Sequence, residues 1–155
     1  MIKIDLLKNH QDAIPALANI WNQVLGKIWF PELTIQEIES LTYDELNHPD
    51  ETTSFVALCD EIPAGFCTLK LKEEFRADLG PWLADVVVAP KHQKQGIGKM
   101  LVDVAVRQAK ERGFKKLYLF AFDPTIPEYY KRLGWSQICM DEFKSHRVTV
   151  MEVAL

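Results

Sequence analysis

A short glycine-bearing turn between an apolar run and an amphipathic helix constrains this chain more than any other feature. The apolar run ends with Val-Val-Val-Ala (86–89), the turn reads Pro-Lys-His-Gln-Lys-Gln-Gly (90–96), and a helical apolar pattern follows over 98–113. The turn contains no acidic residue. Free N–H groups at a helix start carry positive partial charge, and glycines allow a ligand to approach the backbone closely. This strand–turn–helix therefore predicts an anion site, with a pyrophosphate as its natural occupant.

Three nucleotide-binding patterns can be compared with this turn. The dinucleotide fingerprint GxGxxG fails because Leu101 stands at the third glycine position. The phosphate-binding loop GxxxxGK[ST] fails because Met100 follows the Gly-Lys pair and because Gln93 stands at the first glycine position. What remains is Gln-x-x-Gly-x-Gly, formed by Gln93, Gly96 and Gly98.

Hydrophobic periodicity predicts the remaining elements as one alternating α/β arrangement. We expect Asp12 to cap the first helix and Gly26 to end it, and Thr34 with Glu37 to form a capping box at the start of the second. The segments 27–33 and 141–146 are predicted to be loops. The predicted strands are 1–7, 53–60, 64–74, 81–89, 115–122, 135–140 and 147–155, and the predicted helices are 12–26, 34–48, 98–113 and 124–134.

Size, charge and cysteine content narrow the class of protein. A chain of 155 residues without repeats or linkers predicts a single domain over 1–155. The net charge of −4 argues against a nucleic-acid-binding protein, which needs a broad basic face. Three cysteines without CxxC spacing predict neither a disulfide framework nor a zinc site. The first residues lack the apolar segment of a secretory signal and no apolar run is long enough to cross a bilayer, so we expect a cytoplasmic protein without a membrane partner.

Two segments together resemble the signatures of a known family. The run VVVAPKHQKQGIGKMLV (86–102) is similar to the Gln/Arg-x-x-Gly-x-Gly/Ala signature of the GNAT superfamily of N-acetyltransferases. The run YYKRLGW (129–135) resembles its second signature, in which a Tyr precedes a Gly by four residues. The element order matches the family over essentially the whole chain. The resemblance implies an α/β (α+β) domain with a mixed central sheet of six to seven strands, about four flanking helices and splayed central strands.

The resemblance also implies how acetyl-CoA, the expected co-substrate, binds; no metal is implied. Its pantetheine arm would lie between the splayed strands, held by the backbone of Val86, Val87 and Val88. Backbone amides of the turn would bind the pyrophosphate, with two lysines adding charge at the rim. The turn residues concerned are Gln93, Lys94, Gln95, Gly96, Ile97, Gly98 and Lys99. Many family members carry an Asn after the fifth strand that contacts the CoA arm. Here Asp123-Pro124-Thr125 replaces it, so the contact is either made by Thr125 or lost.

Two residues are the candidates for catalysis. Tyr130 matches the general-acid position of the family, and a tyrosine suits that role because its unperturbed pKa of about 10 keeps it protonated at neutral pH. Asp85 is the candidate base, because an acid beside a hydrophobic strand can be desolvated enough to accept a proton. Glu32 and Glu37 are alternative bases. The expected oxyanion donor is a backbone N–H of the strand at 86–88.

The acceptor is expected to be a primary amine, on either a small molecule or a protein. In the family the acceptor pocket is usually built from the first two helices, their joining loop and the last loop. Trp29, Phe30 and Glu32 in the joining loop suit an amine through cation–π contact and charge pairing, although the two aromatic rings also suit a lid packed on the core. Two other functions stay open: a CoA-binding sensor or structural module without turnover, and transfer of a longer acyl group. A homodimer is possible.

Overall fold

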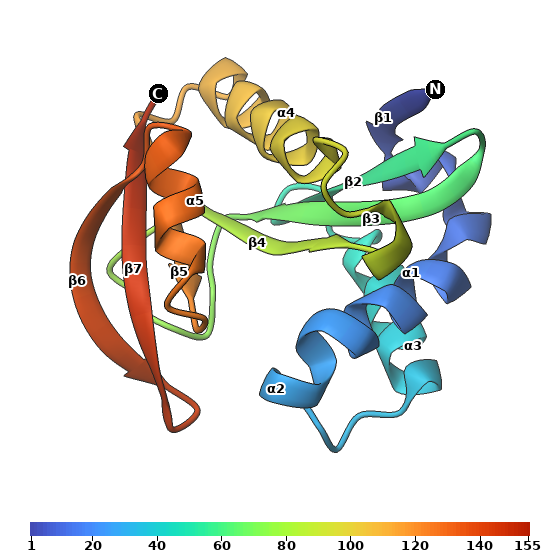
Figure 1. Cartoon of the computed structure of the whole chain (residues 1–155), viewed down its shortest axis with the longest axis horizontal. Helices are drawn as coiled ribbons and strands as arrows, with labels where there is room; N and C mark the ends of the chain where they lie inside the picture. The colour runs from blue at the N-terminus through green and yellow to red at the C-terminus, as the bar shows by residue number, and fades with distance from the viewer.

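Seven strands form one mixed sheet in the order β1-β2-β3-β4-β5-β7-β6 in the computed structural model, which describes all residues 1–155 (Figure 1). Every neighbouring pair is antiparallel except β4 and β5, which are parallel. The strands are β1 (Ile2–Leu6), β2 (Thr52–Cys59), β3 (Ile62–Lys70), β4 (Trp82–Val88), β5 (Lys116–Ala121), β6 (Ser136–Phe143) and β7 (His146–Ala154). The predicted mixed sheet of six to seven strands is confirmed.

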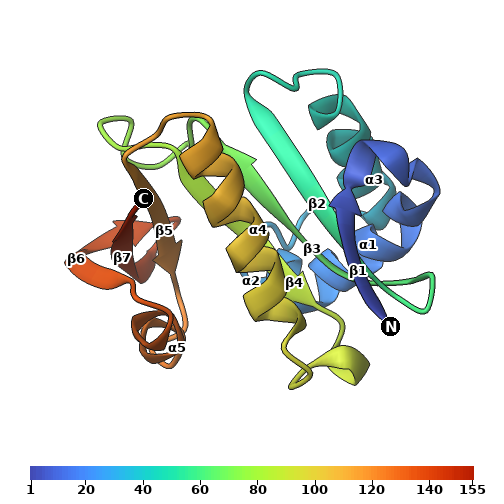
Figure 2. The same cartoon turned by 90° about the horizontal axis from the view of Figure 1, so that it is seen from above.

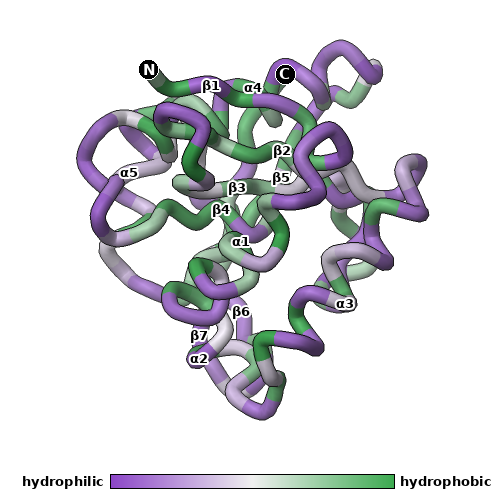
Figure 3. The backbone as a smooth tube through the Cα atoms, turned by 90° about the vertical axis from the view of Figure 1, so that its right-hand side faces the viewer, coloured by the Kyte–Doolittle hydropathy of each residue, from purple (hydrophilic) through white to green (hydrophobic).

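Helices cover both faces of this sheet. Helix α4 (Ile97–Glu111) packs on one face of β2, β3 and β4, while α1 (Ile14–Trp21) packs on the other and contacts α3 (Ile35–Glu45). Helix α5 (Ile126–Arg132) lies beside β5 to β7 (Figure 1). The central strands are largely hydrophobic in Figure 3, whereas most turns are hydrophilic. No helix combines the length and the apolarity that a membrane crossing requires.

Two large cores follow from this layering, and a third, smaller cluster of Phe75, Trp82, Val148 and Val150 joins β4 to β7. The larger one joins α4 to the sheet and to α5, with a fully buried stripe on α4 formed by Leu101, Ala105 and Ala109. The residues of this stripe are spaced four apart, so that they share one face of the helix. The second core lies under α1, whose Ile14 and Leu17 pack against the opposite face of the sheet.

The first helical segment differs from its prediction. Gly26 does not end it: its φ of −61° is helical, and the chain passes through a π-helical turn (Asn22–Gly26) directly into α2 (Lys27–Trp29). The predicted loop 27–33 therefore begins as helix. Glycine is needed here for space, because a Cβ at Gly26 would lie 2.9 Å from the Trp21 ring. The predicted Asp12 cap is also wrong, since Asp12 sits in a 3-10 turn and its side chain caps no N–H.

The hairpins also differ in detail from the prediction. The predicted loop 141–146 is mostly strand, because β6 continues to Phe143 and β7 begins at His146. A tight turn of Lys144 and Ser145, with φ of +50° and +66°, connects them. The capping box predicted at the start of α3 is confirmed, with both of its hydrogen bonds present.

Candidate active site

The sheet is split between its two parallel strands. β4 and β5 pair only at Trp82 and Tyr118, and the strands diverge beyond that point (Figures 1 and 2). A cavity of about 740 Å³ opens on this split, with Asp85 and Val86 of β4 on one side and Phe120 of β5 on the other. Backbone groups of the diverging strands are therefore released from the ladder and face a space large enough for a ligand.

A β-bulge lies in β4 at the edge of this cavity. Phe66 of β3 pairs with Val87, but two residues further along β3 Thr68 pairs with Ala84. Two residues of β4, Asp85 and Val86, thus stand opposite one residue of β3. Asp85 takes a left-handed backbone conformation with φ of +55°. Bulges redirect a side chain and interrupt pairing, and both effects occur here at the cavity wall.

The start of α4 supplies a row of free hydrogen-bond donors. None of the backbone N–H groups of residues 94–99 has a hydrogen-bond partner in the protein, and the first helical bond there is from Met100 N to Gly96 O. Gly96 has a φ of +82° at the N-cap. The Gln93 side chain donates to the Val88 carbonyl at 3.1 Å and so connects the turn to the end of β4. Because both Gln93 and Gly98 line the cavity, this donor row adjoins it.

Two adjacent tyrosines of α5 line the cavity. Tyr130 is only 7% exposed, packs edge-on against Trp135 at 5.6 Å, and its hydroxyl has no hydrogen-bond partner in the protein. Burial raises the pKa of Tyr130 well above its usual value. The Tyr129 hydroxyl lies against the start of α4, 3.4 Å from where a Cβ at Gly98 would be. Tyr130 is therefore a protonated phenol, with a donor available to a ligand.

Three carboxylates surround one lysine in the same cavity. Lys70 Nζ lies 3.8 Å from Glu45 Oε1, 3.9 Å from Glu73 Oε1 and 3.9 Å from Asp85 Oδ2, and we refer to Glu45, Glu73 and Asp85 as the carboxylate cluster. Burial raises the pKa of Glu45 to about 7 and also raises the pKa of Glu73. Asp85 additionally accepts the indole N–H of Trp21 at 3.0 Å.

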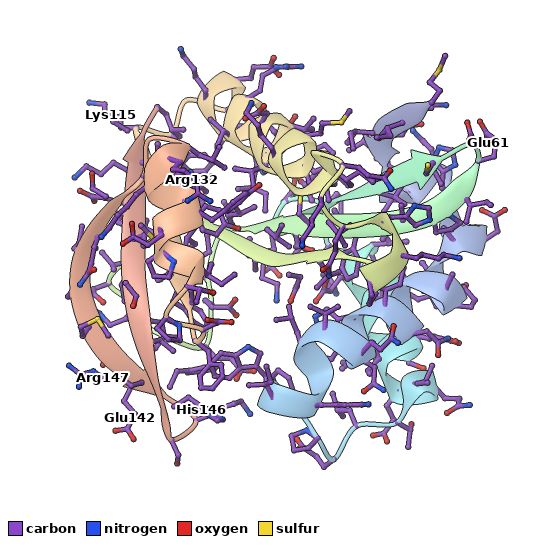
Figure 4. All side chains as sticks on the ribbon, in the orientation of Figure 1. Glu61, Lys115, Arg132, Glu142, His146 and Arg147 are labelled. Carbon is purple, nitrogen blue, oxygen red and sulfur yellow. The ribbon has the colours of Figure 1, made fainter.

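The cavity is closed on one side by an aromatic wall. The Trp29 ring of α2 lies 6.0 Å from Phe120, 5.9 Å from Phe122, 5.5 Å from Phe143 and 5.2 Å from His146 (centroid distances), and we call these five residues the aromatic wall. Figure 4 shows His146 at the hairpin end of β7. The aromatic wall connects the helical half of the molecule to the β5–β7 half across the split.

Comparison with known proteins agrees with this geometry. Residues 14–135, most of the chain, match the acetyltransferase (GNAT) family. The chain belongs to this family.

Curated relatives match this GNAT chain over shorter segments. An N-acetyltransferase ycf52 of Gracilaria tenuistipitata var. liui is 37% identical over 71 residues, which is 46% of this chain and 36% of that protein. A chloroplastic GCN5-related N-acetyltransferase of Arabidopsis thaliana is 41% identical over 51 residues, 33% of this chain and 19% of that protein. The matched segments thus span about a third or less of the relatives' own length.

Solved structures share the GNAT fold over the full chain. The PaiA N-acetyltransferase of Thermoplasma acidophilum, in complex with coenzyme A, is 19% identical with a TM-score of 0.75 and covers 100% of this chain and 99% of that one. YncA of Salmonella typhimurium, with acetyl-CoA, is 16% identical with a TM-score of 0.79, and the match covers 99% of this chain and 94% of that one. At these identities the likeness concerns the fold.

The structure brings part of the predicted cofactor site together. Val86, Val88, Gln93 and Gly98 line the cavity. The side chain of Val87 is instead buried under α1 on the opposite face of the sheet. The other turn residues do not line the cavity: Lys94, Gln95 and Gly96 are exposed, Ile97 is buried in the larger core, and Lys99 is exposed and pairs with Asp103 at 2.8 Å.

Residues predicted outside the turn fall into two groups. Tyr130 and Asp85 both line the cavity, as do Trp29 and Phe30. Thr125 does not, because its N–H and hydroxyl both donate to Asp123 at 2.8 Å. The two alternative bases are also elsewhere, since Glu37 is engaged in the α3 capping box and Glu32 is exposed outside the cavity lining.

Sequence reasoning missed four of the six charged residues of the cavity, namely Glu45, Lys70, Glu73 and Glu74. Glu45 ends α3, Lys70 ends β3, and Glu73 follows β3 in the loop to β4. Polar residues at the end of an element usually face solvent, so their positions carried no signal. These residues come together only in the folded structure, because they belong to different elements. No three His, Cys, Asp or Glu side chains are placed to hold a metal ion.

Proposed function

We propose that this GNAT protein transfers the acetyl group of acetyl-CoA to a primary amine. One observation supports this most directly: the split between β4 and β5 adjoins six unpartnered backbone N–H groups of residues 94–99. A strand-like pantetheine arm fits the first feature, and a pyrophosphate fits the second. The coenzyme A and acetyl-CoA complexes of two proteins with the same fold are consistent with this use of the site.

The residues present fit this co-substrate. We assign the pyrophosphate to the N–H groups of residues 94–99, with the exposed Lys94 ammonium, which has no ion-pair partner, beside them. Gly98 leaves the approach open, because any Cβ there would extend toward Tyr129 and Val88. We assign the pantetheine arm to the backbone of Val86 and Val88, which face the cavity next to the bulge.

The side chains of the cavity provide for each proton in the transfer. The amine nitrogen forms a bond to the acetyl carbon while the carbon–sulfur bond breaks. A carboxylate accepts the proton that leaves the amine, and Tyr130 donates its phenolic proton to the departing sulfur. A backbone N–H of Val86 or Val88 stabilises the negative charge that develops on the carbonyl oxygen.

The carboxylate cluster offers two candidates for the base. Asp85 lies at the bulge, where it accepts the Trp21 N–H at 3.0 Å and lies 3.9 Å from the Lys70 ammonium. Glu45, whose pKa burial raises to about 7, is tuned closer to neutral pH. We keep Asp85 as the base nearest to the bulge and add Glu45 as the alternative. The pH profiles of kcat/KM for the Asp85→Asn and Glu45→Gln variants separate the two candidates. In the variant that lacks the base, kcat/KM no longer falls on the acidic side of the profile.

The assignment of Tyr130 is tested by Tyr130→Phe. Loss of a general acid typically costs between about 100-fold and 10,000-fold in rate, so we expect kcat to fall by about 100-fold or more with little change in acetyl-CoA affinity. Free-thiol release over a panel of amines measures turnover, and calorimetry measures affinity. Tyr43→Phe is the matched control, since this hydroxyl lies on α3 outside the cavity lining.

Two results would count against the proposal. Turnover of Tyr130→Phe equal to that of the parent would remove Tyr130 from the mechanism. Tight acetyl-CoA binding without thiol release for any amine would instead favour a sensor or structural module.

A further inference from the structure

The charges that line the cavity are strongly unbalanced. Five carboxylates line the cavity, but only one ammonium does. The carboxylates belong to Glu45, Glu73, Glu74, Asp85 and Asp123, and the ammonium belongs to Lys70. The whole chain has 22 acidic and 18 basic residues, so its overall composition does not account for this ratio. A cavity of this kind attracts cations.

Lys70 neither neutralises the carboxylate cluster nor forms hydrogen bonds with it. Its ammonium lies 3.8 to 3.9 Å from one oxygen of each of the three carboxylates, and it makes no hydrogen bond to any of them. The side chains remain only partly exposed, at 15% for Glu73 and 23% for Asp85, so water solvates them incompletely. One shared ammonium leaves two negative charges when all three acids are ionised. A second ammonium from a ligand would find carboxylate oxygens without partners.

A reacting group lines the same cavity. Tyr130 is more than nine-tenths buried, and its hydroxyl has no partner in the protein. Asp85, Glu45 and Glu73 line the cavity together with Tyr130. The acids and the proposed proton donor therefore belong to one chamber.

The aromatic wall limits the shape of what can enter. Trp29 joins α2 to β5 and to the β6–β7 hairpin, and the Lys144 ammonium lies 4.1 Å above the Phe30 ring at the same side. These contacts join α2 and the residue after it to β5 and the β6–β7 hairpin, and so narrow the cavity on this side. Aromatic faces accommodate methylene groups and ammonium ions alike, so a slender aliphatic cation suits this chamber.

We infer that the acetyl acceptor is a linear aliphatic amine with a second ammonium group, and that the carboxylate cluster recognises this second charge. The inference rests on the proposed function and specifies its acceptor. One nitrogen of the acceptor reacts next to the bulge in β4. The other nitrogen is held within the chamber by Glu73, the member of the carboxylate cluster that is not a candidate base.

A series of four-carbon acceptors tests this directly. 1,4-Diaminobutane, 1-aminobutane and 4-aminobutanoate share a reactive amine and a chain length but end in an ammonium, a methyl and a carboxylate group. We expect kcat/KM of thiol release to be about tenfold or more higher for the diamine than for the monoamine, as for a partly desolvated charge pair, and lowest for the aminobutanoate.

Variants assign the preference to the cluster. Glu73→Gln should reduce the ratio of diamine to monoamine kcat/KM by about tenfold, with a smaller change for the monoamine alone. Lys70→Met should increase the ratio, because it removes the competing ammonium. Glu61→Gln is the matched control: it makes the same charge change at the β2–β3 turn, far from the cavity (Figure 4), and should leave the ratio unchanged.

The outcomes separate this inference from the proposed function. Equal kcat/KM for the diamine and the monoamine, or transfer only to a peptide N-terminus, overturns the inference and leaves acetyl transfer standing. If no amine is acetylated, calorimetry of 1,4-diaminobutane binding tests the cationic site without the need for turnover. Binding that Glu73→Gln weakens and Glu61→Gln does not supports the cationic site, while no binding refutes it.

Discussion

Glu45→Gln should make the protein more stable above neutral pH. Glu45 ends α3 inside the cavity, where burial raises its pKa to about 7, and Lys70 only partly counteracts this effect. The nearby charges of Asp85, Glu73 and Asp44 raise the pKa further. Glutamine has nearly the same shape as the protonated acid but never has to be ionised. The substitution therefore removes the free-energy cost of ionising this position.

The size and the pH window follow from the two pKa values. The folded protein holds the proton of Glu45 up to about pH 7, whereas the unfolded chain releases it near 4.5. Between these values the folded state binds more protons, so the free energy of unfolding falls as the pH rises through this window. The gap of about 2.5 corresponds to about 3.4 kcal/mol. Because 35% of the side chain is exposed and solvent screens its interactions, we expect about 1 to 2 kcal/mol.

Urea unfolding of both proteins at pH 5, 6, 7 and 8 measures this effect. The variant and the parent should differ little at pH 5, and the variant should be the more stable by about 1 to 2 kcal/mol at pH 8. Glu73, whose pKa burial also raises, contributes to both curves and largely cancels in the difference. Glu39→Gln on the same helix is the control, since Glu39 makes no ion pair. A difference that does not change with pH, or a less stable variant at pH 8, would refute the reasoning.

Three further substitutions test other parts of the site. Gly98→Val adds methyl groups toward Tyr129, whose hydroxyl would lie 3.4 Å from the new Cβ; calorimetry should show acetyl-CoA affinity reduced by about tenfold or more while the unfolding free energy changes by about 1 kcal/mol at most. Arg76→Met breaks the hydrogen bond that joins the β3–β4 loop to Asp141 on β6, so steady-state kinetics should show a raised acceptor KM at a stability cost of about 1 kcal/mol or less. Trp29→Ala opens the aromatic wall and should raise kcat/KM for benzylamine relative to 1-aminobutane.

Local patterns were sufficient for most of the fold. The apolar period of 98–113 predicted α4, and alternating or continuous apolar runs predicted all seven strands. The hairpin turns were placed less accurately, because the connections predicted at 61–63 and 141–146 are tight turns at 60–61 and 144–145. Asp60-Glu61 and Lys144-Ser145 adopt positive φ without glycine or asparagine, the residues by which such turns are usually recognised. Their conformation is imposed by the pairing of the long strands on either side.

The site was predictable where its chemistry is local and not where it is tertiary. The donors of the turn follow from consecutive residues, so Gly96 and Gly98 were sufficient to indicate them. The carboxylate cluster takes Glu45 from α3, Lys70 from β3 and Asp85 from β4. No spacing along the chain encodes that meeting, which depends on how α3 packs next to the sheet.

The bulge at Asp85 explains why the site lies where it does. In a regular strand, Leu83 and Val87 would share a face because they are four residues apart. In this fold Leu83 belongs to the core under α4 and Val87 to the core under α1, so the strand must change its alternation between them. One extra residue makes that change, at a cost of roughly 1 kcal/mol for its left-handed backbone. The Asp85 side chain consequently packs in neither core and can contact both Trp21 and Lys70. Asparagine also tolerates this backbone, and Asp85→Asn therefore tests the carboxylate while it keeps the bulge.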